Sequence, residues 1–278
     1  MSSGLVVNTN ISALNAQRQM LKTNDALSTS MQRLASGMRV NSAKDDAAGL
    51  AIADGMTSQI RGMTVATRNA NDGISLAQTA ESAMGELTNT LQRMRDLAVQ
   101  SSNDGAVSAD DRNKMQDEFG ELNAELERIS TSTQFNGKGV INGSIDAAIF
   151  QVGANVDADN RISVTISDME TVLASVIGVT ISDTAANASE AITEIDAAIK
   201  SIDSSRSKLG ATQNRFTTTI SNLQSSIENQ SAARSRIMDT DFAAETAALS
   251  RNQVLQQAGT AMLSQANQAP QSVMSLLR

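Results

Sequence analysis

Apolar residues recur every three or four positions along most of the chain, which is the spacing of one face of an α-helix. In the first half this pattern covers residues 74–98 and, after a turn at 101–105, residues 115–129. In the second half it holds a heptad register over residues 192–227. Because a helix of this length is not stable by itself in water, the stripes predict long helices that pack against one another.

Both ends of the chain carry narrower apolar stripes with the same spacing. Neither stripe is wide enough to bury a core of its own. Each would be satisfied by pairing with the other end and then with further copies of the chain. We therefore predict a terminal coiled coil that is also an interface for self-assembly, formed by Leu27, Met31, Leu34 and Met38 near the N-terminus and by Leu255, Met262, Val273 and Leu276 near the C-terminus.

Residues 135–185 have a different pattern. Ile162, Val164 and Ile166 alternate with Ser163 and Thr165, a period of two that predicts a half-exposed β-strand. Its expected partner is the stretch 149–152, joined to it by a polar turn at 155–160.

Together these patterns predict a mainly α protein. It would be a long antiparallel helical rod or coiled coil, built from both halves of the chain, with a small β-hairpin region between them. We expect a terminal coiled-coil core domain made of residues 1–45 and 236–278. We expect a helical rod domain at 46–235, with its β-hairpin region at about 135–185.

The composition weakens every enzymatic interpretation. The 278 residues include no Cys, His, Trp or Tyr, only five Phe and a single proline. Imidazole, thiolate and large aromatic groups supply much of the proton transfer, metal ligation and stacking in enzyme sites. We therefore predict a protein that is not an enzyme and takes no cofactor or metal, although carboxylates, Lys and Ser remain available. The lack of Cys also excludes disulfide bonds.

The charge is placed unevenly. The net charge is −8, and each end of the chain (1–60 and 231–278) is at +1, so the middle is at −10. An acidic chain is a poor nucleic-acid binder, and nearly neutral ends indicate burial there. No apolar run reaches the length of a membrane helix, so we expect no membrane insertion. Residues 1–11 lack the regions of a secretory signal peptide, so we expect no cleaved signal.

Two polar clusters are better explained by local structure than as sites, the first as a hairpin turn and the second as a helix start or a surface ion pair. Asp157, Asp159 and Asn160 begin like a calcium loop, but the glycine and glutamate that such a loop requires are missing. Residues 44–46, a lysine followed by two aspartates, could be drawn as an acid–base group. Without a cleft around them, a solvated helix start or a surface ion pair is the better interpretation.

Methionines recur at helical spacing, which allows two interpretations. They can pack in a helical core, or they can form an interface whose flexible thioethers adapt to neighbours that slide slightly. The residues concerned are Met20, Met31, Met38, Met56, Met63, Met84 and Met94.

Several separate stretches, in the right order along the chain, resemble the bacterial flagellin family. The resemblance covers essentially the whole chain, and its clearest stretches are SGMRVNSAKDDAAGLAI at 36–52, NANDGIS at 69–75, TQFNG at 133–137, IMDTDFA at 237–243 and the run from QANQ at 265–268 to the final LLR. The chain departs from larger family members because it lacks their long variable insert, in whose place stand only residues 140–190.

The resemblance implies a structural subunit that polymerises into the flagellar filament, the propeller for swimming. The two termini would form an inner coiled coil that lines the filament core. A hook–filament junction protein is the nearest alternative, because it would share the terminal coiled coils. A soluble enzyme and a secreted adhesin or toxin-like coiled coil are more distant alternatives.

The resemblance also implies partners and a location. Besides further copies of itself, the chain would meet a flagellar export chaperone, the filament cap and hook-junction proteins. It would leave the cell unfolded through the flagellar type III apparatus, without a cleaved signal peptide, and reside in the extracellular filament. Ends that order only on assembly suit that route.

Two groups of surface residues follow from the resemblance alone. Arg93, Leu97 and Glu118 match the patch that the vertebrate Toll-like flagellin receptor recognises, with Asp96 where glutamate is common; these residues could equally stabilise neighbouring helices. Some flagellins carry O-linked sugars on their most exposed region, which here would place them on Ser163, Thr165 and Ser167.

Overall fold

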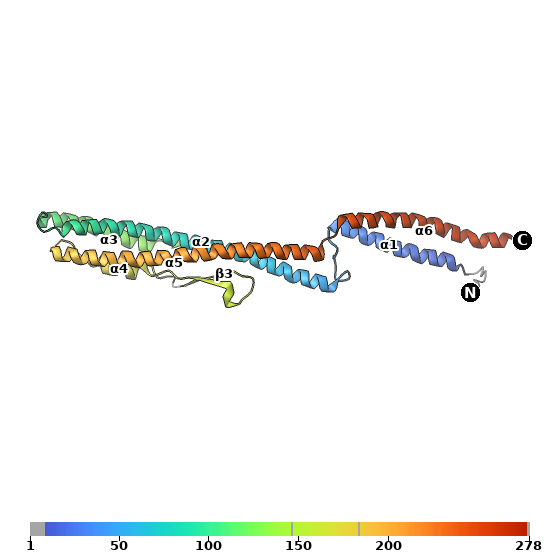
Figure 1. Ribbon diagram of the computed structural model, residues 1–278, viewed down its shortest axis with the longest axis horizontal. Helices are drawn as coiled ribbons and strands as arrows, with labels where there is room; N and C mark the ends of the chain where they lie inside the picture. The colour runs from blue at the N-terminus through green and yellow to red at the C-terminus, as the bar shows by residue number, and fades with distance from the viewer. Residues whose placement is uncertain (1–8, 146, 183, 277–278) are drawn as a thin grey trace. The chain divides into compact units, whose positions relative to one another are not determined.

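The computed structural model describes residues 9–145, 147–182 and 184–276, with side chains near the C-terminus described as far as residue 268. This part of the chain forms six α-helices and four short strands (Figure 1). In chain order they are α1 (Ile11–Ser36), α2 (Ala47–Ser101), α3 (Ala109–Ser132), β1 (Gln134–Phe135), β2 (Lys138–Gly139), β3 (Ala148–Gln151), β4 (Arg161–Val164), α4 (Met169–Ile177), α5 (Ala185–Met238) and α6 (Phe242–Leu276). The prediction of a mainly α protein is confirmed.

The chain divides into two compact units. A terminal unit combines Met1–Ser58 with Asn229–Arg278, and a central unit comprises Gln59–Glu228. The helices α2 and α5 each contribute residues to both units. Each unit is made from both halves of the chain.

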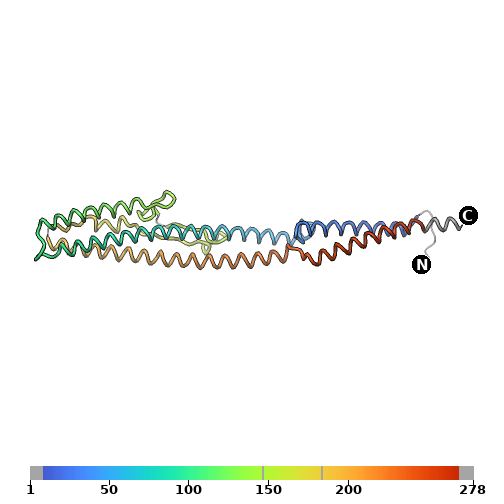
Figure 2. Tube along the Cα trace, turned by 90° about the horizontal axis from the view of Figure 1, so that it is seen from above, coloured from blue at the N-terminus to red at the C-terminus, as the bar shows by residue number. Residues whose placement is uncertain are grey.

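In the terminal unit, α1 and α6 lie side by side and antiparallel (Figures 1 and 2). The amide of Asn10, at the start of α1, donates to the backbone oxygen of Ala266 over 2.7 Å. Further along, the amide of Gln256 donates to the side-chain oxygen of Asn24 over 2.9 Å. Residue numbers that rise on one helix while they fall on the other establish the antiparallel direction.

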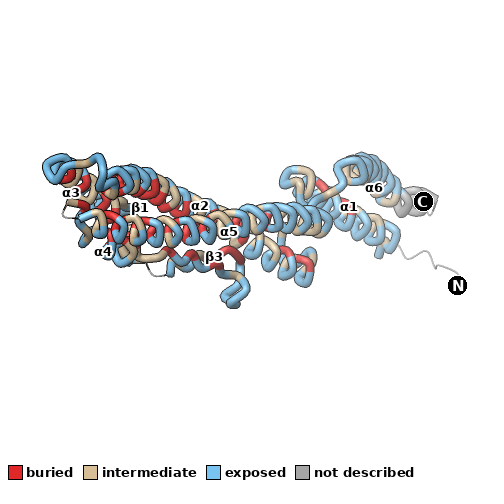
Figure 3. The backbone as a smooth tube through the Cα atoms, turned by 60° about the vertical axis from the view of Figure 1, so that its left-hand side comes forward, coloured by how far each residue is buried: buried red, intermediate tan, exposed pale blue. Residues whose placement is uncertain are grey.

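In the central unit, α2 and α5 also run antiparallel. Gln213 donates to Glu81 over 2.9 Å, and Arg95 donates to Asp196 over 2.6 Å. The facing sides of these helices, with α3, α4 and the hairpin, bury a continuous apolar core (Figure 3). Its fully buried large side chains include Met84, Leu87, Leu91, Met94, Phe119, Leu126, Ile195 and Phe216.

The predicted hairpin is confirmed. Strands β3 and β4 pair antiparallel, with Phe150 opposite Ile162 and Ile149 opposite Ser163. Along β4, Ile162 and Val164 are buried while Ser163 is exposed, which is the alternation that the sequence indicates.

The middle region also contains elements that the sequence analysis did not predict. The short helix α4 is capped by Asp168, whose carboxylate accepts from the Glu170 amide, and it buries Met169, Leu173 and Val176. Large apolar side chains stand at 169, 172, 173, 176 and 177, which is a helical spacing, but a nine-residue segment shows it over only about two turns. The two-residue strands β1 and β2 form a further small hairpin.

A pair of glycine substitutions on α2 tests the packing of the central unit. The Phe216 ring is fully buried, meets Phe150 edge-on with centroids 5.7 Å apart, and lies 2.6 Å from the position of a Cβ at Gly73. Gly73→Ala should lower the free energy of unfolding by about 1–3 kcal/mol, because the ring has no space to move into. Urea unfolding followed by circular dichroism measures the change.

Gly85→Ala is the matched control on the same helix. Nothing lies within 4 Å of a Cβ at Gly85. Because Ala favours a helix more than Gly does, this variant should be more stable by about 0.5–1 kcal/mol. Equal effects of the two substitutions would contradict the packing of Phe216 on α2.

Candidate assembly site

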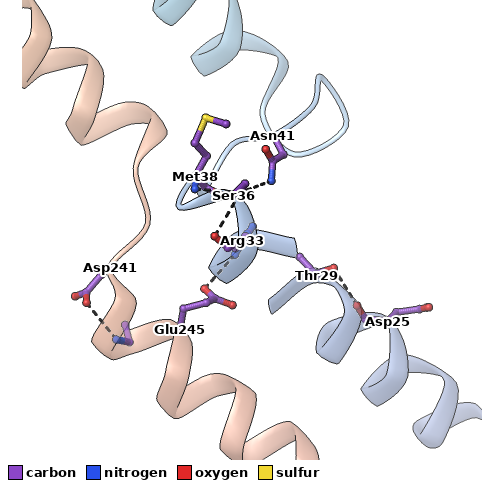
Figure 4. A network of polar contacts seen from close by, with 9 residues as sticks. Asp25, Thr29, Arg33, Ser36, Met38, Asn41, Asp241 and Glu245 are labelled. Atoms are coloured by element: carbon purple, nitrogen blue, oxygen red, sulfur yellow. Dashed lines mark hydrogen bonds and ion pairs between the residues drawn. The ribbon is translucent and has the colours of Figure 1, made fainter. Parts of the chain in front are cut away.

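The terminal helices are positioned by their caps and by residues 239–241, the short connection between α5 and α6. Asn10 caps α1 by accepting from the Ala13 amide over 3.1 Å, and Gly37 ends it with a left-handed φ of 72°. The Thr240 amide donates to the oxygen of Gly37, and Asp241 caps α6 by accepting from the Ala243 amide (Figure 4). These contacts fix where α1 ends beside the start of α6.

The side of α1 that faces α6 has a heptad spacing but little apolar volume. Of the described residues of α1, only Thr23 and Ser30 are buried. Half-buried residues at the same spacing complete this face: Ala13, Ala16, Met20, Leu27 and Leu34 on α1, and Leu249, Asn252, Gln256, Gly259, Leu263 and Ala266 on α6. We call this contact the α1–α6 seam.

One ion pair crosses the seam. Arg33 of α1 lies 3.8 Å from the carboxylate of Glu245 on α6, and the glutamate side chain is only 14% exposed (Figure 4). This ion pair and the contacts of Asn10 and Gln256 fix the direction and register of a seam whose apolar residues are only half-buried.

The predicted interface residues fall on two different faces. Leu27 and Leu34 are half-buried in the α1–α6 seam. Met31, Met38, Leu255 and Met262 are exposed, and the side chains of Val273 and Leu276 lie outside the described residues. The single apolar stripe of the sequence is therefore split in the described structure between the seam and the outer surface.

The exposed part lies outside the seam, in one row on each helix. On α1, Leu14, Leu21 and Met31 each follow a seam position by one residue, so they lie on one flank of the seam. On α6, Leu255 and Met262 each precede a seam position by one residue, and because the two helices are antiparallel this row lies on the opposite flank. We call these two rows, with Met38 just after α1, the outer stripe: Leu14, Leu21, Met31, Met38, Leu255 and Met262.

Other exposed apolar residues were not singled out by sequence reasoning. Phe242 and Val254 of α6 are 55% and 64% exposed. Their positions follow no three-and-four spacing with Leu255 and Met262, so periodicity could not have found them.

The predicted receptor patch joins α2 to α3. The Arg93 guanidinium donates from Nε and Nη2 to one carboxylate oxygen of Glu118, over 2.9 and 2.6 Å, and both side chains are about half exposed. Leu97, one turn further along α2, belongs to the apolar core and is only 3% exposed. The structure thus brings Arg93 and Glu118 together at the surface, whereas the side chain of Leu97 is buried.

The predicted sugar positions differ in accessibility. Ser163 and Thr165 are exposed on and just after β4. Ser167 is half-buried, and its hydroxyl accepts from Ser205 of α5 over 3.0 Å.

The polar cluster at 44–46 builds the start of α2. Asp46 accepts from the Gly49 amide over 2.8 Å. Asp45 accepts from the backbone amides of Asn41 and Ser42 and from the Ser42 hydroxyl. These bonds, that from the Ser42 hydroxyl foremost, lower the pKa of Asp45 below its usual 3.8. The helix-start interpretation agrees with this geometry.

Within the described residues, no group of three or more acidic side chains could hold a metal ion. None of the helices there is long and apolar enough to cross a membrane. The site consists of apolar surface and polar register contacts, so the chemistry that it can perform is non-covalent packing.

Comparison with known protein families identifies the kind of protein that carries this surface. The family model of the bacterial flagellin N-terminal helical region matches residues 7–146, and that of the bacterial flagellin C-terminal helical region matches residues 192–277. The chain belongs to the bacterial flagellin family.

Curated relatives support this over the whole chain. A flagellin of Halalkalibacterium halodurans is 45% identical over 274 residues, which cover 99% of this chain and 100% of the relative. The flagellar filament 33 kDa core protein of Treponema phagedenis is 43% identical, with 99% of this chain and 100% of the relative covered. Flagellin B of Vibrio cholerae is 40% identical, with 98% and 99% covered.

Solved structures agree. The crystal structure of Bacillus cereus flagellin is 29% identical and superposes with a TM-score of 0.51, covering 60% of this chain and 94% of that one. A flagellar hook-associated protein of Vibrio parahaemolyticus has a TM-score of 0.60 but only 12% identity, covering 70% of this chain and 100% of that one, which shows a shared fold alone.

The flagellin chain is thus a structural subunit of the flagellar filament, an extracellular polymer of many copies. The alternative of a hook–filament junction protein is not favoured, because the full-length similarity is to flagellins.

The turn before α2 gives a prediction on pH. Because the folded pKa of Asp45 is lowered, its contribution to stability is complete above 3.8 and is lost as the pH falls through the lower folded value. A carboxyl-carbon NMR titration should therefore give Asp45 a pKa below 3.8, and Asp45→Asn should remove this part of the acid dependence. A titration midpoint at or above 3.8 would show that the three hydrogen bonds do not hold the charged form.

Proposed function

We propose that the outer stripe of the terminal helices is the surface through which neighbouring copies pack in the filament. The observation that supports this is the exposure of Met31, Met38, Leu255 and Met262 beside a seam that buries no large apolar residue among those described. An apolar surface left in water on a chain that polymerises is covered by the terminal helices of neighbouring copies, through a head-to-tail contact that does not close on itself.

In this proposal the predicted domains keep their roles. Residues 1–45 and 236–278 form the inner coiled coil of the filament, and residues 46–235 form the outer helical rod. The α1–α6 seam holds each subunit's termini in register, and the outer stripe joins subunits. Small shifts of packing along such seams would let the filament supercoil.

We infer that the chain is not an enzyme. Its composition lacks imidazole and thiol groups, and the family that it belongs to is structural. No cofactor is required for assembly by packing alone.

For export, we propose that the chain passes unfolded through the flagellar type III apparatus and keeps its N-terminus. Shallow burial in the terminal unit means that little stability is lost when these helices unfold, and no disulfide has to be reduced. An export chaperone that covers the outer stripe would prevent premature polymerisation. The cap and hook-junction proteins would meet the same terminal helices at the two ends of the filament.

For recognition by a vertebrate Toll-like flagellin receptor, we propose that Arg93 and Glu118 make the direct contacts. Both are half exposed and are joined to each other. Leu97 would act from the buried core, by fixing the packing of α2. For O-linked sugars, we propose Ser163 and Thr165 as the accessible acceptors, with Ser167 less available because of its bond to Ser205.

A charge placed on the outer stripe should block polymerisation. Met31→Lys with Met262→Lys should raise the critical concentration by about tenfold or more, since a buried ammonium without a partner is strongly unfavourable. Sedimentation of polymers grown from seeds measures this, while circular dichroism monitors the helices of the monomer.

Gln32→Lys with Gln257→Lys is the matched control. Both glutamines are exposed on other faces of α1 and α6, so the charge change is the same. The control should polymerise like the parent chain. If both double variants polymerise normally, or both fail, the outer stripe is not the assembly surface.

The receptor proposal is tested on the purified monomer. Arg93→Ala should reduce receptor-driven signalling severalfold, because it removes a surface cation and leaves Glu118 unpaired. Arg95→Ala, which breaks the separate ion pair with Asp196, is the control and should leave signalling unchanged. Equal signalling by Arg93→Ala and the parent chain would refute the assignment.

The intact mass of subunits from sheared filaments tests processing and sugars together. Retention of the N-terminal segment predicts a mass no lower than that of the 278-residue chain without Met1. Sugars on Ser163 or Thr165 would add mass that Ser163→Ala with Thr165→Ala removes. A mass lower than this limit contradicts the uncleaved segment, and a mass equal to the bare chain contradicts the sugars.

A further inference from the structure

The methionines of the chain are divided between its two units by their exposure. The sequence has 13 Met. In the central unit, Met63, Met84, Met94 and Met169 are at most 7% exposed, and Met115 is half-buried. In the terminal unit, Met20, Met56 and Met238 are half-buried, and Met31, Met38 and Met262 are 49%, 36% and 60% exposed. All three exposed methionines among the described residues therefore lie in the terminal unit and on the outer stripe.

From this arrangement we infer that Met31, Met38 and Met262 are sites of reversible oxidation that control whether a subunit can enter the filament. The inference rests on the proposed assembly role of the outer stripe. The oxidant is a peroxide, and the site is open only in the unassembled chain.

The chemistry needs only the thioether and the peroxide. The sulfur attacks one peroxide oxygen, an S–O bond forms, and the O–O bond breaks. For hydrogen peroxide, the other oxygen leaves as water after proton transfer. The sulfur loses two electrons and becomes a sulfoxide, while the peroxide is reduced. Because the chain has no cysteine, no thiol competes with these thioethers for the oxidant.

The environment of the three side chains makes them accessible. Met31 and Met262 project from the flanks of α1 and α6 outside the α1–α6 seam. Met38 follows the end of α1, where its thioether points away from the contacts of Ser36 and Asn41 (Figure 4). By contrast, Met84 and Met94 are fully enclosed between α2 and its neighbours, so they are protected.

The consequence for assembly follows from the polarity of the product. A sulfoxide is a strong hydrogen-bond acceptor on what was a flexible apolar side chain. When a second copy covers the outer stripe, the sulfoxide oxygen is left without a partner, which weakens the contact. Oxidised monomers should be excluded, whereas thioethers already covered in the polymer should be protected.

The experiment treats purified full-length monomer with hydrogen peroxide, maps sulfoxides by peptide mass spectrometry, and measures the critical concentration for seeded polymerisation. Met31, Met38 and Met262 should oxidise before Met84, Met94 and Met169. The critical concentration should rise by about tenfold or more. Methionine sulfoxide reductases A and B together, with dithiothreitol as the two-electron donor that is oxidised to its disulfide while the sulfoxide oxygen leaves as water, should restore it. Preformed filaments should take up oxygen at these positions more slowly than monomers.

The matched variant is Met31→Leu with Met38→Leu and Met262→Leu, which keeps the stripe apolar and removes the reactive sulfur. After the same treatment it should polymerise as before treatment. The inference is overturned if the oxidised parent chain polymerises normally, if the leucine variant loses assembly on oxidation to the same extent, or if the reductases restore nothing. Should the leucine variant fail to polymerise at all, recovery of the parent chain by the reductases decides the question.

The outcomes separate this inference from the proposed function. A block by Met31→Lys with Met262→Lys, together with normal polymerisation after oxidation, leaves the outer stripe as the assembly surface and refutes its oxidative control. Normal polymerisation of the lysine variant refutes both the assembly role of the outer stripe and its control by oxidation.

Discussion

The structure depends on one constraint: a long helix with a narrow apolar stripe must find a partner along its whole length. The central unit meets this constraint within one chain. There α2, α3, α4 and α5, with the β3–β4 hairpin, bury Leu, Ile, Met and Phe side chains completely. The terminal unit meets it only in part, because the larger apolar side chains of the α1–α6 seam are only half-buried and the buried residues of α1 are Thr23 and Ser30.

This difference gives the two units different tasks. A fully buried core makes the central unit stable in each subunit before any contact with another copy. In the terminal unit, contacts such as Asn24 with Gln256 and Arg33 with Glu245 set the direction and register of α1 against α6, but bury little apolar surface. The remaining apolar surface, the outer stripe, is therefore free to contact other copies of the chain.

Sequence patterns were sufficient for the helices and for the β3–β4 pairing, because a period of three to four and a period of two are direct signatures of local geometry. They gave only a weak signal for α4, because its helical spacing extends over only nine residues. They also could not show which residues of the terminal stripe face α6 and which stay exposed. The spacing of apolar residues placed Leu27 and Met31 in one seam. In the structure, pairing with α6 buries Thr23 and Ser30 and leaves Met31 outside.

The most direct measurement is a cryo-electron microscopy reconstruction of filaments grown from this chain, at a resolution that shows side chains. The account predicts that α1 and α6 keep their antiparallel seam within each subunit. It also predicts that Met31, Met38, Leu255 and Met262 are covered by the terminal helices of neighbouring copies. A filament in which these four side chains face water, while subunits join through other surfaces, would contradict it.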